Sequence, residues 1–363
     1  MPNSYEIRVY NQVMQLQVII ADYYSLDYAL KVNEITPLTL EIPDSYWTSF
    51  GKDYQIEVYR NMDGGNLGID NFSRWFVTSI ARNDQNVMTV KASDAKVLLT
   101  RRHVLFTAGS AQASKTATAA DDIMKTIILE NFGASSVRTY ANISTLLTIQ
   151  ANQTAAQVTS KSFAWQEVFS TLKSLADDST GRGTYLAFDV VAPAAGNQLL
   201  DFRTYTICRG VDRSASVTVS PELGTMSNTT YTLDWSNEKS FIEVGGQGEG
   251  ANRQLATLTD TVRIGSSLWG YNELFLDSRN TSASAQLTGE AQSEMWARRR
   301  IQKLEGDILQ VGTYLYGRDY GFGDIISAQF KGQTFTGRCD QLQVSSTPGA
   351  PDVITIKFQS VTA

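Results

Sequence analysis

Short stretches of alternating apolar and polar residues dominate the first hundred residues of this chain. The alternation is strict at 5–9, 38–42 and 54–58, and shorter apolar runs follow at 75–77 and 87–90. Successive side chains of a strand point to opposite faces, so a period of two predicts strands with one buried and one polar face. Many short strands at fairly even spacing, separated by turn residues, favour a barrel or a sandwich.

Helical patterns interrupt this β pattern. Residues 121–132 carry an apolar stripe and end at Gly133, and a second helix is expected at 162–176, with Trp165, Val168, Phe169, Leu172 and Leu175 on one face. The small-residue segment 108–120 predicts a linker, and residues 134–161 show no pattern that assigns a structure.

Strand patterns return from Tyr185 and again over the last sixty residues, ending in alternation at 354–358. A third helix is expected at 285–304, which is dense in good helix formers. The order of β block, helical insert, β block, helix and β block predicts an α+β, β-dominated chain of several domains.

Composition restricts the function. Of 363 residues only 19% are charged, against about 25% in typical soluble domains, and the net charge is −6. The surface must therefore be rich in neutral polar groups, and a nucleic-acid binder is not favoured. The N-terminus lacks a signal-peptide pattern, and no apolar run approaches the ~18 residues that span a bilayer. We expect synthesis in the cytosol and no stable membrane insertion.

Few residues offer catalytic chemistry. His103 is the single histidine and stands beside two arginines, so we interpret it as an exposed or strand-end residue. Asp121 and Asp122 are interpreted as capping carboxylates of a helix. Cys208 and Cys339 show no metal-binding spacing, which favours two buried thiols over a disulfide or a metal pair. We expect no catalytic residue, metal or cofactor.

Two further motifs have a plain and a sharper interpretation. The run from Val244 to Gly250 resembles a phosphate loop, but it lacks the Lys-Ser/Thr pair, and Glu249 would repel phosphate. We interpret it as a tight glycine turn. The triplet Arg298 to Arg300 is expected on a solvated or ion-paired helix face, with docking onto an acidic neighbouring subunit as the alternative.

Seven segments together resemble the tail-hub, or baseplate-hub, proteins of long-tailed bacteriophages, and they follow that family's order. The segments are LKVNEITPLTLEIP (30–43), LLTRRHV (98–104), DDIMKTIILENFG (121–133), FRTYT (202–206), GVDRS (210–214), LDWSNEKSFIEVGGQGEGANR (233–253) and DYGFGDIISAQF (319–330). The 134–161 stretch has no clear counterpart.

The resemblance implies a fold of two tube-like β-barrels with intervening α/β domains. The expected domains are a first barrel at 1–110, an α/β insert at 111–183, a β-rich middle domain at 184–284, a connecting helix at 285–305 and a second barrel at 306–363, joined by strands from the middle of the chain.

The resemblance also implies a structural virion protein. A homotrimer would join the six-fold tail tube to a three-fold tip or spike, in the virion tail. The implied partners are the tail tube and distal tail proteins, the tape-measure protein, a central spike or fibre, and viral DNA that passes through without specific binding. We expect acidic side chains to line that channel, and hydrogen-bonded rather than salt-dependent interfaces between subunits.

Two alternatives stay open at this stage. Distal-tail ring proteins share similar barrels and form six-fold rings. The 6 Trp and 16 Tyr also allow binding or cleavage of host-wall carbohydrate, although the chain ends shortly after its last expected strand, which leaves no room for an appended lytic domain.

Overall fold

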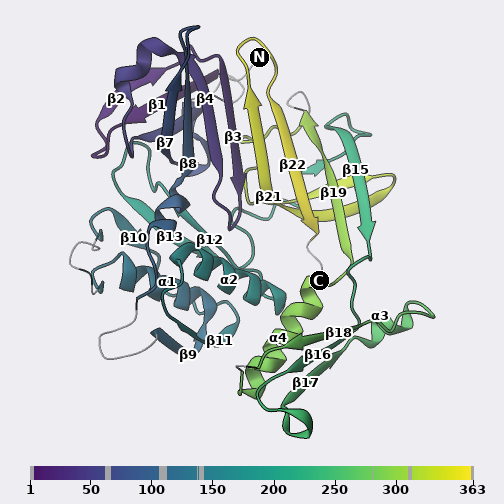
Figure 1. The fold of residues 1–363 in the computed structure, drawn as a ribbon. Helices are drawn as coiled ribbons and strands as arrows, with labels where there is room; N and C mark the ends of the chain where they lie inside the picture. The colour runs from purple at the N-terminus through teal and green to yellow at the C-terminus, as the bar shows by residue number, and fades with distance from the viewer. Residues whose placement is uncertain are drawn as a thin grey trace.

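A computed structural model describes residues 4–61, 67–105, 113–136, 138, 143–279, 281–309 and 313–360. Within these residues the strands form four sheets, and helices are few (Figure 1). The α+β, β-dominated class expected from the sequence is therefore confirmed.

The N-terminal strands form half of a large sheet. They are β1 (Ser4–Tyr10), β2 (Leu16–Ile20), β3 (Ser25–Lys31), β4 (Pro37–Pro43), β5 (Gln55–Asn61), β6 (Leu67–Ile69), β7 (Trp75–Arg82) and β8 (Val87–Asp94). Their alternating patterns place one face on the core, as in β4, where Leu38, Leu40 and Ile42 are fully buried. The 3-10 helices η1 (Asp44–Ser49), η2 (Asp70–Phe72) and η3 (Ala95–Arg101) connect them.

Strands from the second half of the chain complete the same sheet. They are β14 (Thr218–Val219), β15 (Met226–Asp234), β19 (Ile301–Leu309), β20 (Ile325–Phe330), β21 (Gln333–Ser346) and β22 (Val353–Ser360). The order of the main path is β15-β19-β22-β21-β3-β4-β8-β7-β5-β1-β2. One hydrophobic core serves both halves, because β21 pairs directly with β3. β15, from the middle of the chain, belongs to this sheet.

The strand pairing of the described residues does not close on itself. It ends at β15 on one side and at β2 on the other, and the eight strands from β7 to β15 lie side by side across the molecule in Figure 1. The two barrels that the resemblance implies therefore remain a prediction, because the strand pairing within a single chain does not show them.

An α/β insert lies against the N-terminal half of the sheet. It contains β9 (Ala113–Ala119), α1 (Ala120–Asn131), β10 (Leu147–Ile149), β11 (Val158–Phe163), α2 (Val168–Gly181), β12 (Ala187–Val191) and β13 (Leu200–Tyr205). Its helices and the β10-β13-β12 sheet enclose a second core. Apolar side chains spaced three to four residues apart along α1 and α2 supply that core.

The insert corrects two expectations. Residues 113–119 of the expected linker form β9, which pairs with β11, and residues 108–112 lie outside the described residues. The second helix starts at Val168 rather than 162, and Trp165 is 63% exposed with a positive φ of 64°. Trp165 therefore lies in the turn before the helix and not on its buried face.

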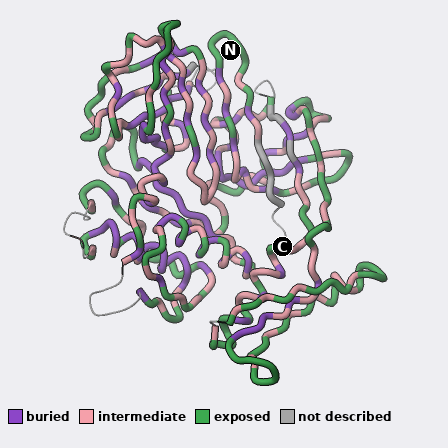
Figure 2. Tube along the Cα trace, viewed as in Figure 1, coloured by how far each residue is buried: buried purple, intermediate pink, exposed green. Residues whose placement is uncertain are grey.

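A small module follows β15. It contains β16 (Phe241–Gly245), η4 (Gly250–Asn252), β17 (Leu255–Thr259), α3 (Thr261–Gly265), β18 (Glu273–Asp277) and α4 (Ser284–Ala297). α4 packs on one face of the three strands. The expected helix at 285–304 ends earlier, at Ala297, because β19 begins at Ile301. Figure 2 shows that the tip around α3 is mostly exposed. The side chains of Val262, Leu268 and Trp269 in this part of the chain are exposed.

Candidate functional sites: equivalent strand sets, open edges and an arginine-lined pocket

Two groups of four strands in the large sheet have the same order and the same directions. The first strand set is β3-β4-β8-β7, and the second strand set is β15-β19-β22-β21. Within each set every strand is antiparallel to its neighbour. Each set then continues to one further antiparallel strand, β5 after β7 and β20 after β21. The chain therefore contains the same arrangement twice, in one sheet.

The third strands of the two sets share a sequence motif in the same register. β8 and β22 both read Val-x-Thr-x-Lys, ending at Lys91 and Lys357. Lys91 pairs with Ser79 of β7, and Lys357 pairs with Gln341 of β21. This repeat is visible in the sequence, and our sequence reasoning missed it.

The first strands of the two sets also correspond. Relative to the shared motif on the neighbouring strand, Leu38 of β4 and Leu304 of β19 occupy the same position. Tyr28 of β3 pairs with Leu38, and Tyr231 of β15 pairs with Leu304. Both tyrosines pack against the large core. β15 is therefore the counterpart of β3.

The two sets meet at the junction of β21 and β3. β21 pairs with β20 up to Arg338, and after a register shift it pairs with β3 from Gln341 onward. At this junction Leu342 lies opposite Leu30, and these side chains are only 1% and 3% exposed. Main-chain pairing and buried apolar side chains thus join the two sets.

The outer ends of the paired sets are open. β7 pairs with β5 up to Phe76, shifts register after Val77, and from Ser79 has β8 as its only partner among the described strands. β15 has only β19 as a partner among those strands. Leu233 of β15 is 37% exposed, and Ile80 of β7 is half-buried. Such edges are templates for pairing with another chain.

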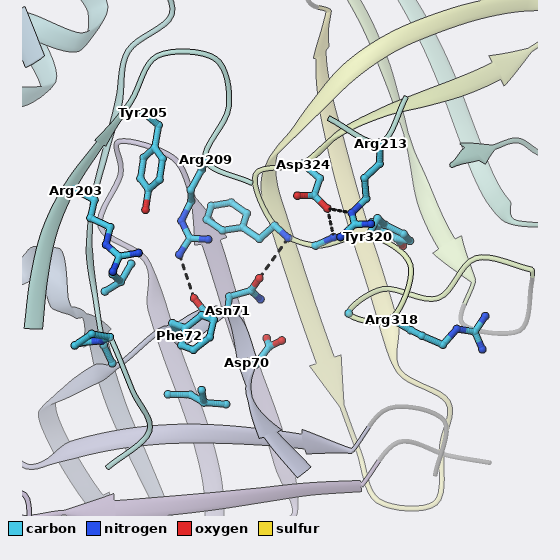
Figure 3. A pocket seen from close by; sticks show the side chains of 17 residues that line it. Asp70, Asn71, Phe72, Arg203, Tyr205, Arg209, Arg213, Arg318, Tyr320 and Asp324 are labelled. Carbon is cyan, nitrogen blue, oxygen red and sulfur yellow. Dashed lines mark hydrogen bonds and ion pairs between the residues drawn. The ribbon is translucent and has the colours of Figure 1, made fainter. Parts of the chain in front are cut away.

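A cavity of about 430 Å³ lies where the N-terminal strands, the insert and the C-terminal half meet (Figure 3). Four arginines line it: Arg203, Arg209, Arg213 and Arg318. Each has a carboxylate partner within the chain, at 2.6, 2.6, 2.9 and 2.9 Å in that order, namely Asp201, Asp189, Asp324 and Asp319. The positive charge is therefore neutralised by the chain itself, which makes the pocket a structural junction.

Asp189, beside this pocket, forms ion pairs with two cations. It lies 3.2 Å from the Lys96 Nζ and 2.6 Å from the Arg209 Nε. Burial by itself would raise the pKa of Asp189, but the two cations outweigh burial and hold the pKa well below its usual range. Arg209 also donates to the Asn71 carbonyl, 3.1 Å away. The cluster joins η3, the insert and η2.

The candidate residues singled out in the sequence do not come together in one site. His103 is exposed, and its main chain forms an isolated antiparallel β-bridge with Glu167. Cys208 is half-buried, Cys339 is buried, and neither forms a disulfide. Arg298 pairs with Glu294 at 3.2 Å, and Arg299 lies over the Trp296 ring. In the described residues we find no cluster of three metal-ligating side chains.

The acidic pair has a different role from the expected helix cap. Asp121 and Asp122 are buried, and they accept hydrogen bonds from backbone N–H groups of residues 153–156 rather than from their own helix. Burial raises the pKa of Asp122, yet hydrogen bonds from Thr154 and Gln153 bring it below its usual value. The pair thus fixes part of the 134–161 stretch.

The glycine run forms the tight turn that was expected. Gly248 has a φ of +105°, and a Cβ there would lie 2.5 Å from the Asn252 carbonyl. The Arg253 guanidinium donates to the carbonyls of Gly245 and Gly246 at 2.9 and 3.2 Å. The turn is filled by this side chain and leaves no phosphate cradle.

The chain has the fold of phage tail proteins. It is similar to the 43 kDa tail protein of prophage MuSo2 from Shewanella oneidensis, with a TM-score of 0.60, 12% identity and 98% of each chain covered. It is also similar to a tail protein from Neisseria meningitidis MC58 (TM-score 0.63, 11% identity, 99% of this chain and 97% of that one). A third match is prophage tail protein gp18 from Listeria monocytogenes EGD-e (TM-score 0.56, 12% identity, 98% and 95% covered).

The family model described as Siphovirus ReqiPepy6 Gp37-like protein matches residues 6–358, and the chain belongs to this family. No curated protein matches the chain. The resemblance seen in the sequence is therefore confirmed at the level of a phage tail or baseplate protein. Within the described residues, none of the helices has the length and apolar character to span a bilayer.

Proposed function

We propose that this chain is a structural hub of the phage tail tip, three copies of which form a ring. One observation carries the proposal: each copy contains two equivalent strand sets joined in one sheet. Three copies would present six equivalent sets, which match a six-fold tail tube on one side and a three-fold spike or fibre on the other. A six-fold distal-tail ring needs only one set per copy, so this alternative is less favoured.

The proposal assigns the strand sets to two tube-like modules. The first is residues 1–110, and the second is residues 306–363 with β14, β15 and the start of β19. The α/β insert from β9 to β13 and the small module from β16 to α4 then form the periphery. Each module would curl into a barrel-like unit only when its open edge is paired in the ring.

The polar face of the sheet would line the channel for viral DNA. On this face Asp27 and Glu41 lie on β3 and β4, while Lys31 and Lys91 lie on β3 and β8. These four side chains carry both signs of charge, and the acidic lining that we expected from the net charge stays a prediction. A mixed, largely neutral surface still suits DNA that passes without specific binding, because binding strength grows with the number of phosphates neutralised.

The exposed apolar tip supports a role in assembly. Val262, Leu268 and Trp269 are 82%, 100% and 90% exposed, and a cluster of large apolar side chains in water is typical of a protein contact surface. The neighbours in the tail, which we take to be the tail tube, distal tail, tape-measure and spike or fibre proteins, are the proposed partners. We assign no enzymatic activity to the chain.

Native mass spectrometry of the purified chain tests the proposal. We expect a main species of three times the chain mass of 40.0 kDa, and its stability should depend little on salt because main-chain hydrogen bonds carry the interfaces. A species of six copies, or a monomer that persists at micromolar concentration in the presence of tail proteins, would contradict the hub assignment.

A further inference from the structure

The partner change along β7 repeats the partner change along β21. In β21 the first part pairs with β20, a register shift follows Arg338, and the second part pairs with β3. In β7 the first part pairs with β5, and a register shift follows Val77. The second part, residues 79–82, has an open edge in the described structure. By equivalence this part should pair with a strand that corresponds to β3.

β15 is that strand, and it lies too far away in its own chain. β7 and β15 are separated by the six other strands of the two sets. A β15 edge that reaches β7 must therefore come from a second copy. The same contact repeated three times would close a ring in which every strand of both sets has two neighbours.

We propose that residues 79–82 of β7 in one copy pair antiparallel with residues 231–234 of β15 in a second copy. This inference rests on the proposed function and adds the contact that closes the ring. The register is copied from the internal junction, where Gln341 pairs with Lys31 and Val344 pairs with Tyr28. Residues 79–82 of β7 take the places of residues 341–344 of β21, and residues 231–234 of β15 take the places of residues 28–31 of β3. The expected pairs between copies are Ser79 with Asp234, Ile80 with Leu233, Ala81 with Thr232, and Arg82 with Tyr231.

The apolar side chains at the two edges fit this register. At the internal junction the opposed pair is Leu342 and Leu30, both almost fully buried. Its counterpart between copies is Ile80 and Leu233, and Leu233 is 37% exposed in the single chain. Pairing would bury an apolar surface that the monomer leaves in water, and it would supply partners for an unpaired strand edge.

The polar side chains at the edges fit as well. Ala81 and Thr232 are exposed and would lie on the polar face of the sheet, like their counterparts Gln343 and Ala29. Arg82 takes the place of Val344 and so lies on the same face as Ile80. Its guanidinium carbon lies 4.8 Å from the centre of the Trp47 ring, and in the proposed register Arg82 would lie opposite Tyr231. No like charges oppose each other in these four pairs.

Cysteine cross-linking tests the register. Ala81→Cys and Thr232→Cys are combined in a Cys208→Ser background, where the remaining Cys339 is buried. Opposed strand residues have Cβ atoms about 4.5–5.5 Å apart, within reach of a disulfide after small adjustment. Mild oxidation should convert most of the chain into covalent dimers and trimers on non-reducing gels. Mixing the two single variants should give only dimers.

The chain offers a matched internal control. Gln343→Cys with Ala29→Cys places the same pair at the β21–β3 junction and should form a disulfide within one chain, seen as a mass loss of two hydrogens without oligomers. Ala81→Cys with Leu233→Cys should not link, because these side chains point to opposite faces.

The outcomes separate this inference from the proposed function. Three-copy particles in which Ala81→Cys and Thr232→Cys do not link, while the internal control does, would overturn the edge pairing and leave the hub intact. Links in a shifted register would overturn the register. Failure to form three-copy particles under any condition would instead contradict the hub itself.

Discussion

Tyr28 and Tyr231 hold equivalent positions in the two strand sets, although 202 residues separate them in the sequence. Tyr28 pairs with Leu38 and Tyr231 pairs with Leu304. Their surroundings differ: Tyr28 is 2% exposed beside β21, whereas Tyr231 lies on the open strand β15 and is only partly buried. One strand has its neighbour within the chain, and we infer that the other finds its neighbour in a second copy.

A charge placed at the open edge should block assembly without unfolding the chain. We expect Leu233→Lys to weaken association at least about tenfold, because the junction would bury an unpaired ammonium group. At a dilution at which both proteins are monomeric, its melting temperature should stay within about 3 °C of wild type, because the residue is 37% exposed in the single chain. Size-exclusion chromatography with light scattering and thermal melts give both quantities.

The equivalent residue provides the contrast. Leu30, at 3% exposure, occupies the same position in β3, so Leu30→Lys should unfold the chain or lower its melting temperature strongly. Equal effects of the two substitutions would argue that β15 is already covered in the monomer.

Loss of the Arg209 side chain should destabilise the junction of insert and sheet. We expect Arg209→Met to cost about 3–5 kcal/mol, because buried Asp189 would keep only Lys96 as a counter-charge. Arg318→Met is the matched control. The Arg318 side chain, which pairs with Asp319, is 42% exposed, so the free energy of unfolding should fall by less than about 1 kcal/mol. Denaturant unfolding curves of both variants measure the difference.

Asp340 should make a contribution to stability that falls with rising pH. Burial raises the pKa of this carboxyl to about 6, and Arg338 and the Tyr185 hydroxyl only partly offset burial. The unfolded value is about 3.9, so between roughly pH 4 and 6 the native chain holds a proton that the unfolded chain has lost. The stability contributed by Asp340 is therefore complete below about pH 4 and lost above about pH 6.

The variant Asp340→Asn isolates this effect. Its free energy of unfolding should rise by up to about 3 kcal/mol relative to that of wild type as the pH is raised from 4 to 7, and it should show no such gain below pH 4. The measurement is the difference between the two unfolding free energies across this range. A difference that stays constant with pH would show that the carboxyl is ionised normally.

The glycine turn should tolerate no side chain. Gly248→Ala should cost about 1–3 kcal/mol, because its φ is +105° and the new Cβ would meet the Asn252 carbonyl. Gly68→Ala, where a Cβ meets nothing within 4 Å, should be nearly neutral. Thermal melts of the two variants provide the comparison, and equal melting temperatures would contradict the tight turn.

The sequence was sufficient for elements whose signal is local. Alternation at Leu38, Leu40 and Ile42 predicted a strand with one buried face, and that face is fully buried. Local patterns failed where a tertiary contact decides. Residues 298–304 continue a run of good helix formers, but Ile301 starts β19 because it pairs with β15. Asp121 and Asp122 fit a helix cap, yet a loop over thirty residues away takes their hydrogen bonds.

The junction between the strand sets is the feature that local patterns do not reveal. Leu342 and Leu30 are opposed although 311 residues separate them in the sequence, and alternation identifies each strand without identifying its neighbour. The repeated Val-x-Thr-x-Lys motif in β8 and β22 was the one signal in the sequence that pointed to two equivalent sets. The cavity beside Arg209 likewise depends on four distant segments.

End-on electron-microscopy class averages of the purified ring address the duplication most directly. We predict a particle whose outline has three-fold symmetry and whose inner wall shows six similar lobes, two from each copy. An inner wall with three lobes, or six lobes contributed by six copies, would contradict the account.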